Sequence, residues 1–197
     1  MPLSPPAERE LLHLRDIALR GWRRADGRYD IEAHLRDTKT SPIPNDHRGE
    51  IPPGEPLHGM GLRLTVDEDL IVVACEAASD HTPYAMCPQA APNFAALAGL
   101  RIGPGFNRAV AERVGGVKGC THLRELLGQM ATVAYQTLYP VFAARERAAA
   151  ARRAATGEAP PAGRPGLVGT CLAYAPDSPV TLARWPHLRA AETEGVG

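Results

Sequence analysis

The sequence predicts an α+β protein, in which an antiparallel β-meander of about four or five strands forms a curled sheet that a C-terminal set of helices packs against. In the first part of the chain, apolar and polar residues alternate in short runs that turn-forming residues separate, as in half-buried strands. Further along, apolar residues recur at helical spacing. The segregated order, strands first and helices second, favours the α+β class.

The first two strands are expected over residues 14–25 and 28–38, joined as a hairpin. Asp26-Gly27 lies between them, and glycine readily adopts the positive φ that a tight hairpin turn requires. In the return strand, alternate residues up to Leu35 are apolar and indicate a core face: Tyr29, Ile31, Ala33 and Leu35. The other face is a row of titratable side chains: Asp30, Glu32, His34 and Arg36.

The next stretch, residues 41–56, contains five prolines and two glycines, so a long irregular loop is expected. Strands are expected to resume over 57–66 and 70–79. The last of these is nearly all apolar, which predicts a strand buried on both faces.

Helices are expected over residues 88–100 and 106–114, followed by a main helix that begins at Thr121 and carries a wide apolar stripe. Pro140 is expected to kink the main helix or to mark a short continuation.

We expect a single domain over residues 1–197, with its core at about 10–145. An Ala/Arg-rich extension and linker occupy 143–166, and the segment 167–190 is expected to pack back on the core through its apolar and aromatic residues.

Composition narrows the function classes. The chain has 22 basic and 22 acidic residues, and its aromatic content is 5%, so neither nucleic acid nor an anionic membrane is an expected partner. The four cysteines form no Cys-x-x-Cys pair, and the N-terminal segment has no apolar signal sequence. A cytoplasmic protein without transmembrane spans is therefore expected, with a homodimer as the default assembly.

The densest titratable cluster lies on the second predicted strand and comprises Glu32, His34, Asp37 and Lys39. Partial burial beside the long loop would adjust the imidazole and carboxylates for proton transfer near neutral pH. A solvated outer face of a sheet has the same pattern, so both interpretations remain open.

His58 follows the long loop directly and has either a structural or a ligand-binding role. If the second and third strands pair, His34 and His58 could approach each other and, with a carboxylate, offer enough ligands for a metal. The sequence has no H-x-H or H-E-x-x-H spacing. Neither a metal nor an organic cofactor is therefore expected.

Cys120 and His122 flank the start of the main helix, where free N–H groups favour an anion or a ligand. A capping turn of ordinary residues is the alternative. Three further residues are candidates for substrate binding: Arg63, Glu76 and Tyr84. Glu76 stands out because it is the single charge in an apolar strand, and Arg63 is its expected partner.

Four blocks of the chain carry a family resemblance: GWRRADGRYDIEAHLRDTK, GEIPPGEPLHGMGLRLTVD, GVKGCTHLRELLGQMATVAYQT and GTCLAYAPDSPV. Together they resemble a bacterial family described as a domain of unknown function, over about residues 8–188. Some members resemble cofactor-independent lyases of lignin-derived aromatic dimers, which release formaldehyde from a hydroxymethyl group and leave a stilbene. The resemblance assigns no catalytic residue.

The resemblance implies a cofactor-free carbon–carbon lyase that acts on a small aromatic substrate. In this hypothesis Glu32, His34 or His122 removes a hydroxyl proton, and Lys39 or Arg63 stabilises the developing oxyanion. The alternatives are a non-catalytic protein that binds a small ligand or an acyl thioester, a metal-dependent enzyme with a His/carboxylate site, and a purely structural interaction protein.

Overall fold

The computed structural model describes residues 3–159 and 165–189 of the chain. The chain divides into two compact units, residues 1–142 and 143–197. The first unit holds the sheet and the helices that pack on it. The expected packing of the C-terminal segment against the core stays a prediction, because the segment lies in the second unit.

Four long strands form one antiparallel sheet in the order β1-β2-β5-β6. Their bounds are His13–Arg23 (β1), Tyr29–Lys39 (β2), Pro56–Val66 (β5) and Val72–His81 (β6). The sheet is a meander of sequential neighbours, since β3 and β4 lie outside it. The predicted α+β class is confirmed.

The long Pro-rich loop contains regular structure, contrary to the expectation. Strands β3 (Ile43–Asn45) and β4 (Gly49–Ile51) pair as a small separate hairpin. The turn is held by the Asn45 side chain, whose Oδ1 accepts hydrogen bonds from the backbone N–H groups of His47 and Arg48 at 3.1 and 2.9 Å. Prolines at the strand ends and at an edge position do not prevent so short a pairing.

Helices follow the sheet. The helix expected over 88–100 is present as the 3₁₀ helix Cys87–Leu97 (η1), and Pro92 lies inside it. Helix α1 spans Phe106–Val114, as expected, and α2 begins at Thr121 and continues through Pro140 to Thr156. A short 3₁₀ turn, η2 (Gly116–Lys118), links α1 and α2.

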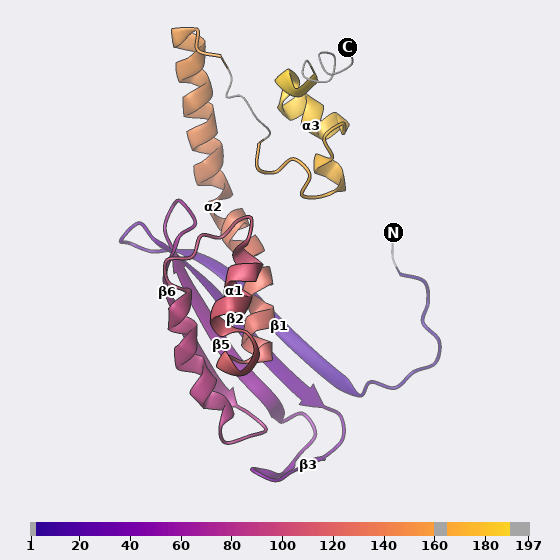
Figure 1. The fold of residues 1–197 in the computed structure, drawn as a ribbon. Coiled ribbons are helices and arrows are strands. Elements are labelled where there is room, and N and C mark those ends of the chain that lie inside the picture. Colours follow the sequence, from indigo (N-terminus) through magenta and orange to yellow (C-terminus); the bar gives the residue numbers. More distant parts are fainter. Residues whose placement is uncertain (1–2, 160–164, 190–197) are drawn as a thin grey trace. The chain divides into compact units, whose positions relative to one another are not determined.

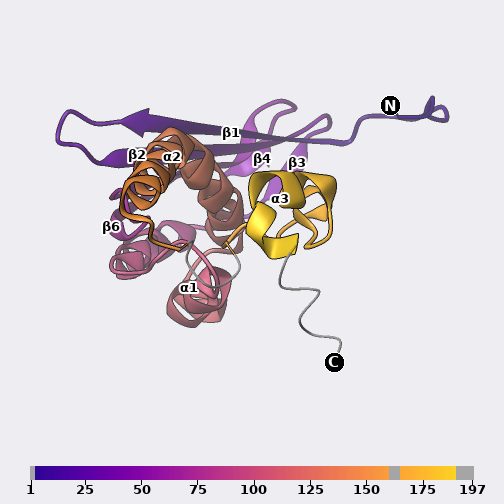
Figure 2. The same cartoon turned by 90° about the horizontal axis from the view of Figure 1, so that it is seen from above.

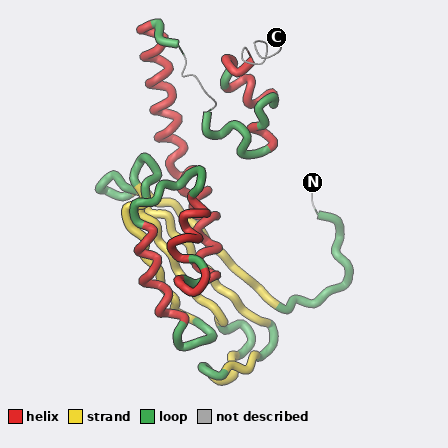
Figure 3. The backbone as a smooth tube through the Cα atoms, in the orientation of Figure 1, coloured by secondary structure: helices red, strands yellow, loops and turns green. Residues whose placement is uncertain are grey.

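The helices of the first unit cover one face of the sheet (Figures 1 and 2). Figure 3 shows the same layering by secondary structure, with the strands behind the helices. The core between the layers combines the predicted face of β2 and the stripe of α2 with residues of β5 and η1. It includes Ile31, Leu35, Leu64, Phe94, Leu123, Leu126, Met130 and Leu138.

Gly21 marks a close approach between β1 and α2. A Cβ atom at this position would lie 1.9 Å from Oγ1 of Thr137. The absent side chain therefore lets the helix rest directly on the edge strand.

Strand β6 is buried on one side only, so the expectation of burial on both faces is wrong. Val72 and Cys75 are buried, but the side chain of Glu76 is 76% exposed. Small alanines make the strand apolar in composition without giving it a second packed face.

The second unit contains the remainder of α2 from Ala143 and the segment 165–189. Helix α3 (Pro179–Arg184) begins at Ser178, whose side chain accepts a hydrogen bond from the N–H of Thr181. It is flanked by the 3₁₀ turns η3 (Leu172–Tyr174) and η4 (Pro186–Arg189). The aromatic rings of Tyr174 and Trp185 pack with centroids 5.9 Å apart. Across the described ranges, no helix combines the length and apolarity needed to cross a membrane.

Candidate active site on the helix-covered face of the sheet

Asp37 is the centre of the candidate site. It continues the core face of β2 two residues beyond Leu35, and only 2% of its side chain is exposed. Its neighbours in register are Arg15 on β1 and His58 on β5. Three adjacent strands thus place an Arg, an Asp and a His side by side at one end of the sheet.

Arg15 holds Asp37 with two parallel hydrogen bonds. Its Nε and Nη2 donate to the two carboxylate oxygens at 2.7 and 2.8 Å. A third donor, Nη1, reaches Oε2 of Glu125 on α2 at 3.2 Å. A bidentate pair of this kind fixes both the position and the plane of the carboxylate.

Three imidazoles surround the same carboxylate. Nδ1 of His58 lies 3.1 Å from Oδ2 of Asp37, and Nε2 of His122 lies 3.8 Å from the same oxygen. Nε2 of His13 lies 3.4 Å from Oδ1. The Asp37 carboxylate is therefore enclosed by groups that are cationic or can become cationic.

The rings of His58 and His122 are in contact, with centroids 3.9 Å apart and planes tilted by 33°. The far side of His122 faces sulfur: its Nδ1 lies 3.9 Å from Sγ of Cys120, which in turn lies 3.9 Å from Sδ of Met60. His122 thus connects the carboxylate to a pair of sulfur atoms.

These side chains border a pocket of about 480 Å³ between β5, η1 and the start of α2. Its volume lies within the usual range for small-molecule sites, roughly 300 to 1,000 Å³. The lining combines the two imidazoles with apolar, sulfur and amide groups: His58, Met60, Pro83, Tyr84, Met86, Cys87, Gln89, Ala90, Asn93, Val117, Gly119, Cys120, Thr121 and His122. The described lining contains no lysine, arginine or carboxylate.

The pKa of Asp37 lies below its usual value. Burial raises this pKa, but the hydrogen bonds and charge of Arg15, together with the charges of His58 and His13, lower it by more. Asp37 is therefore an anion at neutral pH.

The pKa of His58 is also lowered. Burial is the largest cause and the charge of His122 adds to it, whereas the contact with Asp37 acts in the opposite direction. A neutral His58 imidazole is the form expected at neutral pH.

Asp37, His58 and His122 also have the composition of a metal site, with one ligand atom from each lying within 4.8 Å of the others. Arg15 opposes a cation at this place, since its guanidinium charge lies directly on both oxygens of Asp37.

A second group of sequence candidates lies on the opposite face of the sheet. Glu32, His34, Arg63 and Glu76 border a depression of about 170 Å³. Arg63 bridges Glu32 at 2.9 Å and Glu76 at 3.1 Å, so the expected partnership of Arg63 with Glu76 is formed. Because more than half of the Glu76 side chain is exposed, it is not the buried carboxylate that the sequence suggested.

The structure therefore separates residues that the sequence grouped together. Asp37 points to the helix-covered face, whereas Glu32 and His34 point away from it. His34 is opposite Gly61 in the register, and His58 is opposite Asp37, so the expected approach of His34 to His58 does not occur.

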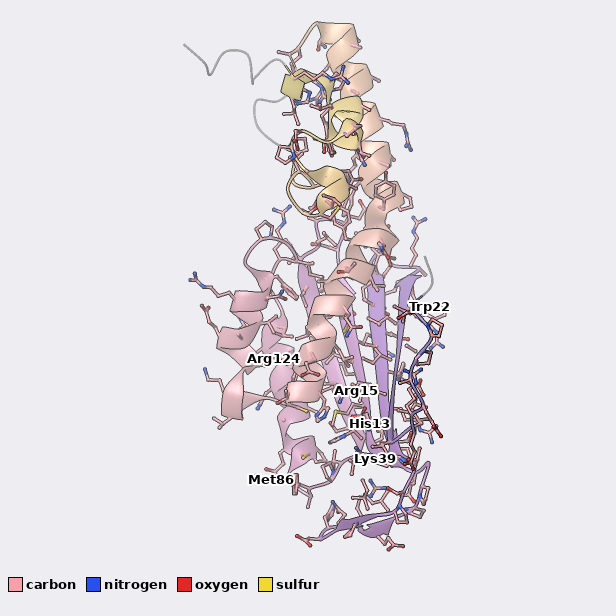
Figure 4. All side chains as sticks on the ribbon, turned by 90° about the vertical axis from the view of Figure 1, so that its right-hand side faces the viewer. His13, Arg15, Trp22, Lys39, Met86 and Arg124 are labelled. Atoms are coloured by element: carbon pink, nitrogen blue, oxygen red, sulfur yellow. The ribbon has the colours of Figure 1, made fainter. Side chains whose placement is uncertain are left out.

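The remaining candidates are more peripheral. Lys39 ends β2 opposite His13, and its carbonyl accepts a hydrogen bond from Gly54 at 2.9 Å. Tyr84 borders the pocket but remains largely exposed. Figure 4 shows His13, Arg15 and Lys39 near the end of the sheet where α2 begins, with Trp22 at the other end.

Arg15 and His13 were missed from the sequence, although a signal was present. They precede Ile17 and Leu19 by two-residue steps, and these two pack against the core. The same spacing places Arg15 and His13 on the helix-covered side of β1.

The reactivity of the Cys75 thiol tests whether the helix-covered side of the sheet is buried. Burial, with a smaller contribution from the Glu76 charge, raises the pKa of Cys75 to about 12. Since the thiolate is the reactive form, Cys75 should remain protonated and resist iodoacetamide at pH 8.5 in the folded protein, whereas the exposed Cys171 should react. We expect a rate difference of roughly a hundredfold or more by peptide mass spectrometry, lost in urea. Equal labelling of the two in the folded protein would contradict this assignment.

Comparison of the sequence with curated proteins and with solved structures finds no match in either set. A family model described as "Protein of unknown function (DUF2889)" matches residues 13–136, which is more than half of the chain. The matched region begins at His13 and extends past His122, so it includes the four side chains that surround Asp37: His13, Arg15, His58 and His122. The chain belongs to the DUF2889 family.

Proposed function

We propose that the pocket catalyses acid–base chemistry, without a metal or an organic cofactor, on a small substrate that carries a hydroxyl group. One observation carries the proposal: His58 contacts a buried aspartate and stacks on a second histidine at the wall of a pocket. A histidine oriented by a carboxylate is a common general base.

In this proposal His58 is the base. Its Nδ1 faces Asp37, so Nε2 is the nitrogen left for a substrate proton. Asp37 fixes the tautomer and stabilises the imidazolium that forms, and Arg15 fixes Asp37 in turn. The low pKa of the carboxylate keeps Asp37 ionised while His58 gains and loses its proton.

His122 is the second proton carrier. The rings of His58 and His122 lie with centroids 3.9 Å apart at the wall of the pocket, so one small substrate can contact both. In the proposed reaction His58 accepts a proton from the substrate, and His122 donates a proton to the leaving group.

A base and an acid side by side suit a lyase that releases formaldehyde, the reaction that the family resemblance implies. His58 takes the proton of a hydroxymethyl group, and the adjoining carbon–carbon bond breaks to give formaldehyde. The electron pair forms a carbon–carbon double bond and expels a hydroxyl group from the neighbouring carbon. His122 protonates this hydroxyl, which leaves as water.

The pocket walls are compatible with an aromatic substrate. Met60 and Met86 offer thioether sulfurs, which make favourable contacts with aromatic rings. Gln89 and Asn93 offer amide groups that can bind hydroxyl or methoxy substituents. The sequence favours Glu32, His34 or His122 as the base, whereas we place the base at His58 and give His122 the role of the acid.

A metal-dependent enzyme is the second candidate, and the close grouping of Asp37, His58 and His122 favours it. In that case the three residues would hold the ion, and Arg15 would have to give up part of its contact with Asp37. Chelation separates the two candidates, because turnover without a metal should survive treatment with EDTA and dialysis.

The proposal is tested by incubating the full chain with aromatic dimers and single-ring alcohols that carry a hydroxymethyl group on the carbon next to a hydroxyl-bearing carbon. Formaldehyde and the dehydrated product should appear in equal amounts by mass spectrometry, with the same rate after EDTA. His34→Gln, on the opposite face of the sheet, should retain turnover. Ligand binding without any product would instead favour a non-catalytic binding protein.

A further inference from the structure

We propose that the sulfur side of the pocket is a site for a soft metal ion, Cu(I), with Sγ of Cys120, Sδ of Met60 and Nδ1 of His122 as its ligands. Cys120 lies 3.9 Å from Met60 and 3.9 Å from His122 through these atoms. All three side chains border the same pocket, so an ion can reach them.

The two distances match a coordination sphere. Sulfur ligands lie about 2.3 Å and histidine nitrogens about 2.0 Å from such an ion, which separates two neighbouring donors by roughly 3.5 to 4.0 Å in tetrahedral or trigonal geometry. An ion bound to Cys120 therefore requires little change in the distance from Cys120 to Met60 or to His122.

The donor types select the metal. Thiolate and thioether sulfurs favour Cu(I), whereas Mg²⁺ and Ca²⁺ prefer oxygen ligands. Zinc binds thiolate and imidazole, but the thioether of Met60 specifically favours copper. Met60 is buried on the core face of β5, so its sulfur is held in place by packing.

His122 has the orientation that metal-bound histidines commonly show. Its Nδ1 faces Cys120, and its Nε2 faces Asp37 at 3.8 Å. A carboxylate that accepts a hydrogen bond from the far nitrogen orients a ligand histidine and makes it a better donor, and a small shift of either side chain from 3.8 Å would form this bond. Asp37 thus orients His122 without binding the ion itself. The Arg15 guanidinium, which is bonded to both oxygens of Asp37, repels a cation from the carboxylate.

The charge of the ligand set is compatible with its place in the fold. Cys120 directly precedes Thr121, the first residue of α2. The N-terminal end of a long helix favours negative charge, and a thiolate with Cu(I) makes a neutral pair that needs no further counter-ion.

This inference goes beyond the proposed enzyme, because it concerns an ion that needs no substrate. It makes His122 a shared residue: an ion on Nδ1 removes it from proton transfer. Copper should therefore inhibit turnover, but the binding test does not depend on turnover.

The test is an anaerobic competition for Cu(I) between the full-length protein and bathocuproine disulfonate. One equivalent should bind to the wild type, and Cys120→Ser should abolish that binding. Met60→Leu, which nearly conserves volume, should weaken it roughly tenfold or more. The control Cys171→Ser removes an exposed cysteine of the second unit and should bind like the wild type.

Circular dichroism of each variant tests whether it is folded. This control distinguishes loss of the copper site from loss of the structure. X-ray absorption of the copper-loaded wild type should show two sulfur scatterers and at least one nitrogen scatterer. The inference is overturned if Cys120→Ser binds copper as the wild type does, or if Cys171→Ser loses the site. Either result leaves the formaldehyde assay, and hence the proposed enzyme, untouched.

Discussion

Replacement of His58 by glutamine is expected to lower turnover by about two to four orders of magnitude, the usual contribution of a general base. Glutamine retains hydrogen-bonding capacity toward Asp37 but cannot take up a proton at neutral pH. Steady-state formaldehyde release measures the effect. The loss should appear mainly in kcat, because a group that acts in the transition state contributes little to ground-state binding.

His34→Gln is the matched control for this variant. It makes the same chemical change on the neighbouring strand but on the opposite face of the sheet. Both variants should melt within a few degrees of the wild type. Equal turnover in His58→Gln and the wild type would remove His58 from the mechanism. If His58→Gln and His34→Gln lost turnover equally, the cause would be a general change in the sheet and not the loss of a base in the pocket.

Replacement of Asp37 by asparagine is expected to cost about 3 kcal/mol of unfolding free energy, because it removes charge-assisted hydrogen bonds from a buried position and leaves a donor of Arg15 without its acceptor. The amide has nearly the same shape as the carboxylate, so packing changes little. Its NH₂ group, however, faces a donor of Arg15 where an oxygen had accepted a hydrogen bond. Urea unfolding followed by circular dichroism gives the difference in free energy.

Glu125→Gln is the control for the Asp37 variant. Glu125 contacts the same guanidinium at 3.2 Å, but half of its side chain is exposed. An exposed pair contributes about 0 to 1 kcal/mol, so this variant should be nearly as stable as the wild type. Similar costs for Asp37→Asn and Glu125→Gln would show that burial of Asp37 is not what makes its pairing important.

The two-residue alternation of strands determined much of what could be predicted. Tyr29, Ile31 and Leu35 identified the core face of β2, and the structure confirms that face. The next step along it is Asp37, whose polar character groups it in the sequence with Glu32 and His34 instead. The two-residue spacing places Asp37 on the core face of β2, but its polar side chain made it look like a residue of the exposed face.

Other parts of the site could not be found by spacing. His122 reaches Asp37 from the start of α2, and 84 positions separate the two residues in the sequence. Such a contact depends on how the helix lies on the sheet, which hydrophobic periodicity within either segment does not determine. Cys120 and Met60 meet for the same reason.

Composition misled the prediction at two segments. The proline content of residues 41–56 concealed the small hairpin of β3 and β4, because a three-residue pairing needs few backbone donors. In β6, the alanines make the strand apolar and so predict burial on both faces, but Ala74 is exposed. Small apolar side chains lose little by facing water, so they are weak indicators of a packed face.

The register of the first hairpin has an evolutionary consequence. Arg15 is opposite Asp37 because five residues, 24–28, separate β1 from β2. A single-residue insertion in that turn, if absorbed by sliding β1, would turn its side chains over and could bring Asp16 beside Asp37. Two carboxylates would then meet in a buried place. Turn length in working relatives should therefore change by even steps, or be compensated by a bulge.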